Sequence, residues 1–160
     1  MKRRRVGMEV NYIPEMKDEL AKQLIELQQQ SYLVEANLIN YSNIPPLSGT
    51  VADLLLEPKT WLTASSDNHI IGAIAIETRV DHWLLNKVIV SPRFFRRGVG
   101  RMLIQKVKEE TSVPLYVTTA SHNTPAVKLY ESEGFTQFKH ERTTDGLLLR
   151  TFVYRKEPGP

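Results

Sequence analysis

The sequence of 160 residues contains no cysteine. Disulfide bridges, thiolate metal sites and a cysteine nucleophile are therefore excluded. No apolar run approaches the roughly 20 residues that a membrane-spanning helix needs. No apolar segment follows the basic residues 2–5 either, so a secretory signal peptide is not expected. These absences predict a soluble cytoplasmic protein without a membrane partner. The length fits a single domain over residues 1–160.

A strong excess of one charge is also missing, because the formal net charge is only +3. Basic side chains cluster at residues 2–5 and 93–101. A short basic tail is usually just hydrated, so nucleic acid is not the expected partner. The histidines have no metal-ligand spacing, and no metal is expected. They are His69, His82, His122 and His140.

The first sixty residues favour helices after one short strand. Residues 8–13 alternate as a strand, and Pro14 is placed to open a helix. A second, short helix is expected over 32–40, and a further helical turn over 50–56, capped by Thr50 or Ser48.

From residue 61 onward strands dominate, at 61–64, 70–78 and 81–90. A helix follows over 99–110, and then an apolar strand over 115–119. The next helix has Thr124 as its expected cap and ends at Gly134, and a hairpin over 135–155 closes the chain. This order predicts a mixed α/β (α+β) domain with a central, twisted, mixed sheet of about six or seven strands and helices on both faces.

The segment from Val88 to Arg101 combines a buried strand, an arginine-rich turn and a helix start. The first N–H groups of a helix lack internal partners and, with the helix dipole, attract an anion. Gly98 and Gly100 let a pyrophosphate approach the main chain, while Arg96, Arg97 and Arg101 add positive charge. A glycine pair alone is weak evidence, because a turn with a hydrated basic face has the same pattern.

Two motifs together resemble the GNAT superfamily of N-acetyltransferases. The first is Val88-Ile89-Val90-Ser91-Pro92 followed by Arg97-Gly98-Val99-Gly100, and the second runs from Asn123 to Phe135 as Asn-x-x-Ala-x-x-Leu-Tyr-x-x-x-Gly-Phe. The resemblance covers residues 70–138 well and the first sixty residues loosely. Phe95 stands where the family often has Gln or Arg, so one polar contact is lost or supplied by Arg96.

The resemblance implies acetyl-CoA as cosubstrate and an acetyl-CoA-binding core over about 60–140. Main-chain groups of the strand would pair with the pantetheine arm, the amides of the loop would hold the pyrophosphate, Asn123 would bind the pantetheine, and Ala126 would leave room for it. An ordinary loop or capping role remains the alternative for Asn123. The implied cofactor-binding residues are Val88, Ile89, Val90, Arg96, Arg97, Gly98, Val99, Gly100, Arg101, Asn123 and Ala126.

Transfer of an acetyl group from a thioester to an amine requires a neutral amine, a stabilised oxyanion and a leaving thiolate that is protonated or hydrogen-bonded. Tyr130 is the candidate catalytic residue that would assist the thiolate; its alternative is an ordinary core tyrosine. The general base stays open among four carboxylates and a water chain. The carboxylates are Glu35, Asp53, Glu77 and Asp81.

Residues 14–57 would form the acceptor side, where Tyr32, Glu35 and Tyr41 suit a small cationic amine. We therefore expect direct transfer to a primary amine of a small molecule in a ternary complex. A protein N-terminal or lysine acetyltransferase and a non-catalytic acyl-CoA sensor are the alternatives. The family resemblance also makes a homodimer possible.

Overall fold

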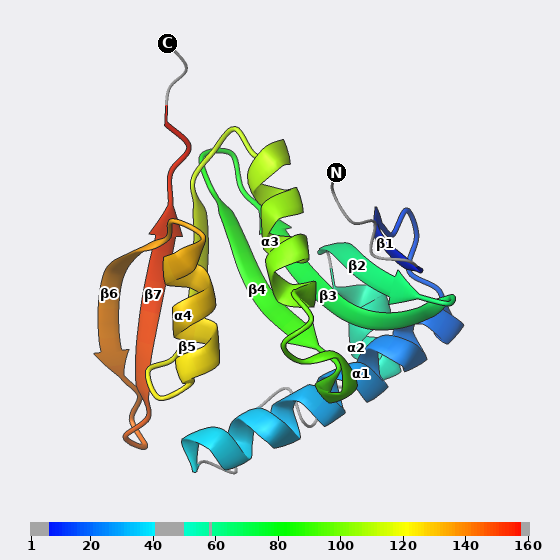
Figure 1. Ribbon diagram of the computed structural model, residues 1–160, viewed down its shortest axis with the longest axis horizontal. Helices are drawn as coiled ribbons and strands as arrows, with labels where there is room; N and C mark the ends of the chain where they lie inside the picture. Colours follow the sequence, from blue (N-terminus) through cyan, green and yellow to red (C-terminus); the bar gives the residue numbers. More distant parts are fainter. Residues whose placement is uncertain (1–6, 41–49, 58, 158–160) are drawn as a thin grey trace.

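The computed structural model describes residues 7–40, 50–57 and 59–157. Seven strands form one sheet in the order β1-β2-β3-β4-β5-β7-β6, which confirms the expected mixed sheet (Figure 1). All neighbouring strands are antiparallel except β4 and β5. These two are parallel, and α3 connects them along the chain. The strands are β1 (Met8–Tyr12), β2 (Thr60–Ser66), β3 (His69–Thr78), β4 (Trp83–Val90), β5 (Leu115–Ala120), β6 (Thr136–Arg142) and β7 (Leu148–Tyr154).

Helices cover both faces of this sheet, as expected. α3 (Val99–Glu110) and α4 (Thr124–Ser132) cover one face, around a core that includes Leu103 and Phe152. α1 (Asp18–Ile39) and α2 (Val51–Leu56) cover the other, where Leu24 and Leu54 pack in the same cluster as Ile89. None of the described helices is long and apolar enough to cross a membrane.

The first helix differs from the sequence expectation. It begins at Asp18 rather than at Pro14, and it continues without a break to Ile39 instead of giving way to a second helix at residue 32. The buried side chains Gln28 and Tyr32 continue the stripe that Leu24 begins, so packing holds the helix together where the polar glutamine run hides its periodicity.

Helix caps show one correct expectation and one wrong one. Thr50 caps α2, since its hydroxyl accepts from the N–H of Asp53 while the carboxylate of Asp53 accepts from the N–H of Thr50. α4, however, is capped by Asn123 rather than by Thr124: the Asn123 Oδ1 accepts from the Ala126 N–H at 3.3 Å.

Gly72 allows the start of α3 to lie close against β3. A Cβ atom on Gly72 would stand 2.8 Å from Val99 Cγ1 and 3.2 Å from Leu103 Cδ1. Only a residue without a side chain fits there without displacing these neighbours. The first turn of α3 is therefore held against the sheet after the loop that follows β4.

Candidate active site

The parallel strands β4 and β5 separate partway along their length. Their register runs from Trp83–Leu115 to Leu85–Val117 and ends there, whereas β4 continues to Val90. On its other side β4 stays paired with β3 as far as Val90. Ser91 donates its N–H to Ile71 at the end of β3, and main-chain groups alternate between the two edges of a strand, so those of Ile89 also face β3. The main-chain groups of Val88 and Val90 therefore face a gap with no partner strand among the described residues. An extended pantetheine arm fits such an edge as an added strand would.

The loop that follows β4 bends sharply before α3 begins. Arg96 and Gly98 both have positive φ, at 64° and 76°. A side chain at Gly98 would strain the backbone, whereas glycine adopts this conformation freely. Gly98 is also the N-cap of α3, so the free N–H groups of Val99 and the residues after it lie at the positive end of the helix dipole. The loop thus fits a pyrophosphate.

The arginines of this loop do not have equal roles. Arg96 and Arg97 are exposed, and the guanidinium of Arg97 lies 5.2 Å from the centre of the Phe94 ring. Phe95 is exposed as well. Because its side chain is apolar, it adds no polar contact where the family often has one.

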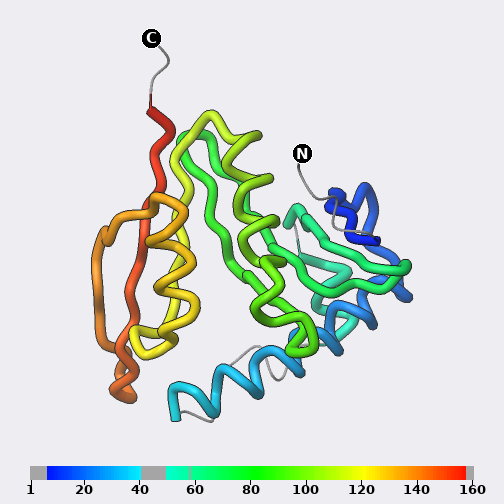
Figure 2. The backbone as a smooth tube through the Cα atoms, in the orientation of Figure 1, coloured from blue at the N-terminus to red at the C-terminus, as the bar shows by residue number. Residues whose placement is uncertain are grey.

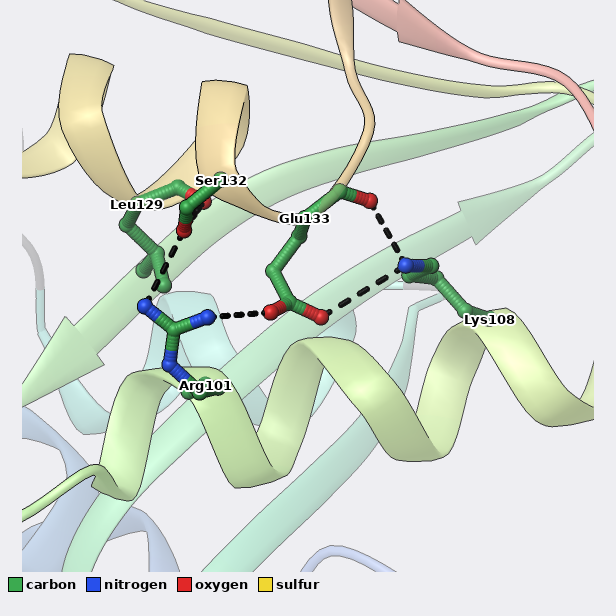
Figure 3. A network of polar contacts seen from close by, with 5 residues as sticks. All are labelled: Arg101, Lys108, Leu129, Ser132 and Glu133. Carbon is green, nitrogen blue, oxygen red and sulfur yellow. Dashed lines mark hydrogen bonds and ion pairs between the residues drawn. The ribbon is translucent and has the colours of Figure 1, made fainter.

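Arg101, by contrast, is bound to α4. Its Nη1 donates to Glu133 Oε2 at 2.5 Å and its Nη2 to Ser132 Oγ at 3.0 Å. Lys108 donates to the main-chain carbonyl of Glu133 at 2.6 Å and lies 3.5 Å from Oε1 of the same residue (Figure 3). The charge of Arg101 is therefore balanced by Glu133, which leaves its main-chain N–H as the group available to the loop.

Asn123 and Ala126 stand at the beginning of α4, just beyond β5. The capping alternative raised for Asn123 holds for its Oδ1. Its side chain also hydrogen-bonds the carboxylate of Glu35 on α1. Ala126 is half-buried beside this cap. Asn123 thus links α4 to α1, and the contact of both residues with pantetheine remains a prediction.

Tyr130 lies within the core on the inner face of α4. It is 4% exposed, and its ring is 5.8 Å from that of Phe135 and 6.0 Å from that of Phe152. Burial, and secondarily the charge of Glu35, raises the pKa of the Tyr130 hydroxyl above its usual value. The phenol therefore stays protonated at neutral pH and is a donor, not a base.

Glu35 is the carboxylate nearest to this chemistry. It is half-buried, and burial raises its pKa, an effect that the hydrogen bond from Asn123 partly offsets. Tyr32, one turn earlier on α1, is buried too, and its pKa is raised by burial, then by the charge of Glu35, and then by Tyr130. Two tyrosines and one glutamate thus form a cluster between α1 and α4.

The other three candidate bases are placed elsewhere. Asp53 serves in the cap of α2. The Glu77 side chain is 29% exposed, and its hydrogen bond from Arg79 lowers its pKa. Asp81 is much more exposed, and its pKa is lowered first by the hydrogen bond with His82, whose Nδ1 lies 2.6 Å away. Carboxylates whose ionised form is stabilised in this way are poor proton acceptors.

The sequence reasoning missed a hollow of about 440 Å³ on the same face of the sheet as α1 and α2. Tyr116 lies on its floor, with its ring 5.6 Å from His82 and 5.2 Å from Phe138. The alternation of β5 could have signalled it, because Tyr116 and Thr118 point away from the apolar face. The lining residues are His82, Leu84, Leu85, Asn86, Tyr116, Thr118, Phe138, Lys139, Glu141 and Thr151.

Some of the residues singled out in the sequence are not among those that the structure describes. The basic residues 2–5, Tyr41 and the alternative cap Ser48 lie outside the described residues. Within residues 7–40, 50–57 and 59–157, no group of three or more His, Asp or Glu side chains is arranged to hold a metal ion.

Comparison with known proteins gives several relatives. The UPF0157 protein YqkA of Bacillus subtilis is 29% identical over 145 residues, or 89% of this chain. The ribosomal protein bS18-alanine N-acetyltransferase of Salmonella typhimurium is 31% identical over 80 residues, or 48% of this chain. The chain spans 42% of the length of the first relative and 54% of the second.

A structural relative has the same fold at lower identity. The PaiA N-acetyltransferase of Thermoplasma acidophilum, solved in complex with coenzyme A, superimposes with a TM-score of 0.71 at 19% identity. The superposition covers 92% of this chain and 99% of that protein. The mixed sheet with helices on both faces is therefore shared with that protein.

The family model of GNAT acetyltransferases matches residues 15–135, which is more than half of the chain. This match confirms the family that the two sequence motifs indicated. The chain belongs to the acetyltransferase (GNAT) family.

Proposed function

We propose that this protein transfers an acetyl group from acetyl-CoA to a primary amine of a small molecule, by direct attack while both substrates are bound. The observation that carries this proposal is the gap between β4 and β5, where pairing ends at Leu85–Val117 although both strands continue. A closed sheet would offer no main-chain edge for the cosubstrate.

The residues of the gap and the loop would bind acetyl-CoA. Main-chain groups of Val88 and Val90 pair with the pantetheine arm, and the amides from Arg96 to Arg101 hold the pyrophosphate. Arg96 and Arg97, both exposed, add charge near it. The bound cosubstrate supplies an activated acetyl thioester.

Tyr130 then assists the leaving group. Since burial keeps its hydroxyl protonated, Tyr130 can donate a hydrogen bond or a proton to the sulfur as charge develops there. The amine attacks the thioester directly, without a covalent enzyme intermediate. The chain has no cysteine that could serve as the nucleophile of such an intermediate.

The hollow over β4, β5, β6 and β7 supports a small acceptor. Its volume of about 440 Å³ suits a molecule of metabolite or drug size. The rings of Tyr116 and Phe138 offer an apolar surface, and Lys139 and Glu141 line the hollow as an ion pair with their charged atoms 3.9 Å apart. Asn86 and Thr118 place this hollow directly beside the point where the strands separate.

The test is release of free coenzyme A from acetyl-CoA with three probe amines: spermidine, kanamycin and a short peptide that begins with alanine. We expect turnover with a small amine, and a loss of roughly 100-fold in kcat for Tyr130→Phe with an unchanged dissociation constant for coenzyme A. Tyr154→Phe, which removes a hydroxyl from the same aromatic group, is the control and should stay active. Absence of coenzyme A binding by calorimetry would overturn the proposal.

A second candidate acceptor is a protein N-terminus. The relative from Salmonella typhimurium, an N-acetyltransferase of ribosomal protein bS18 alanine, favours it through its 31% identity. Turnover of the peptide probe alone would select this candidate, whereas coenzyme A binding without turnover of any amine would favour an acyl-CoA sensor.

A further inference from the structure

Resting on the proposed function, we propose that Glu35 is the general base of the reaction and accepts the proton of the attacking amine. The chain has no carboxylate between Trp83 and Val90, so a carboxylate base has to come from another element. The second half of α1 reaches toward the start of α4 (Figure 2), where Asn123 hydrogen-bonds Glu35.

The position of Glu35 follows from its three neighbours. Asn123, its hydrogen-bond partner, caps α4 two turns before Tyr130. Tyr130 and Tyr32 both lie within electrostatic reach of the Glu35 carboxylate. The carboxylate therefore stands close to the hydroxyl that would assist the leaving sulfur. It belongs to α1, which covers the same face of the sheet as the hollow proposed for the acceptor.

The surroundings of Glu35 suit a proton acceptor. Tyr130 and Tyr32 are 4% and 8% exposed, so water around the carboxylate is restricted on two sides. No lysine or arginine pairs with Glu35 among the described residues, in contrast to Glu77 on Arg79 and Glu133 on Arg101. A carboxylate without a cationic partner is free to attract the ammonium of the acceptor and then to take its proton.

The proton balance of the step is simple. The ammonium group of the acceptor loses one proton to Glu35, and the neutral nitrogen forms a bond to the acetyl carbon while the carbon–sulfur bond breaks. The second proton that the nitrogen loses ends on the thiol of coenzyme A, through Tyr130. Glu35 later returns its proton to solvent, so the enzyme is regenerated.

The variant Glu35→Gln tests this role, because glutamine can still hydrogen-bond Asn123 but cannot accept a proton. We expect kcat/KM at neutral pH to fall roughly 100-fold, with the dissociation constant of coenzyme A changed by less than about twofold. Glu26→Gln, which removes an exposed carboxylate from the same helix, should leave kcat/KM unchanged.

The pH profile separates a base from a merely structural residue. The groups facing Glu35 are Tyr32, Tyr130 and Asn123, and burial raises the pKa of both tyrosines further from neutrality. In the wild type, kcat/KM should therefore fall on acidification as Glu35 is protonated, at a pH above the usual range of a glutamate. This acidic limb should vanish in Glu35→Gln. The exposed His122 precedes Asn123, and His122→Gln should keep the limb.

The outcomes distinguish this inference from the proposed function. A wild type that turns over an amine, together with a Glu35→Gln variant of equal rate and equal pH profile, overturns the role of Glu35 and leaves the transferase intact. A limb lost in His122→Gln also overturns it. A wild type that binds coenzyme A but acetylates none of the three probe amines overturns both.

Discussion

Replacing Glu133 by glutamine tests whether Arg101 supports the fold or the phosphate site. The Glu133 side chain is 6% exposed, whereas those of Arg101 and Lys108 are 45% and 21% exposed. Glu133→Gln removes the negative charge that both cations share and keeps the shape of the side chain. The link between α3 and the end of α4 should weaken.

The magnitude follows from burial. A hydrogen bond to a charged group contributes about 1.5–3 kcal/mol, and breaking a fully buried pair costs about 3–5 kcal/mol. Because water can rehydrate the half-exposed Arg101, we expect the lower range, about 2 kcal/mol. For a domain of this size that corresponds to a fall in Tm of roughly 4–8 °C.

Thermal unfolding and calorimetry with coenzyme A measure the two effects separately. Arg101→Gln should lower Tm about as much as Glu133→Gln while changing the dissociation constant less than about threefold, and a double variant should show coupling of about 1 kcal/mol or more. Arg97→Gln should do the opposite, with weaker binding and an unchanged Tm. If Arg101→Gln weakens coenzyme A binding tenfold and leaves Tm unchanged, the ion pair does not hold Arg101 as described.

Three further predictions concern the frame of the site. Gly98→Ala forces a side chain into φ 76°, so coenzyme A should bind at least about tenfold more weakly by calorimetry, with a backbone strain of about 1–2 kcal/mol. Gly72→Ala places a methyl group 2.8 Å from Val99 Cγ1, and urea unfolding should show a loss of about 1–3 kcal/mol. The hydrogen bond from Tyr12, and then Lys106, lowers the pKa of Glu110, so this contribution to stability is present near neutral pH and is lost as pH falls through the folded-state pKa; Tyr12→Phe should reduce that acid-dependent loss.

Local signals in the sequence were enough to predict the elements around the cosubstrate. α3 has the predicted bounds because Gly98 precedes it and its apolar stripe is regular. Gly134 has φ 87° at the end of α4, and the turn at Gly146, with φ 94°, joins β6 to β7. Each signal depends on the conformation of a few neighbouring residues, and a sequence displays such constraints directly.

Contacts between distant residues could not be predicted in this way. Arg101 and Glu133 are 32 positions apart, and nothing near Arg101 indicates that its charge is already balanced. The hollow beside Tyr116 arises because β7 inserts between β5 and β6, a pairing that the order of the strands along the chain does not reveal. The sequence also cannot decide between Asn123 and Thr124 as the cap of α4. Both residue types are good caps, and only the fold selects Asn123.

The continuity of α1 connects these observations. A helix of 22 residues is about 33 Å long, so its first half can pack on the sheet through Ala21 and Leu24 while its second half carries Glu35 to α4. With a break at residue 32, as the sequence suggested, Glu35 would belong to a short, separately mobile segment. A base on a rigid helix is positioned by the core. Leu24→Ala should therefore reduce both Tm and kcat/KM, although Leu24 lies about three turns away from Glu35 along the helix.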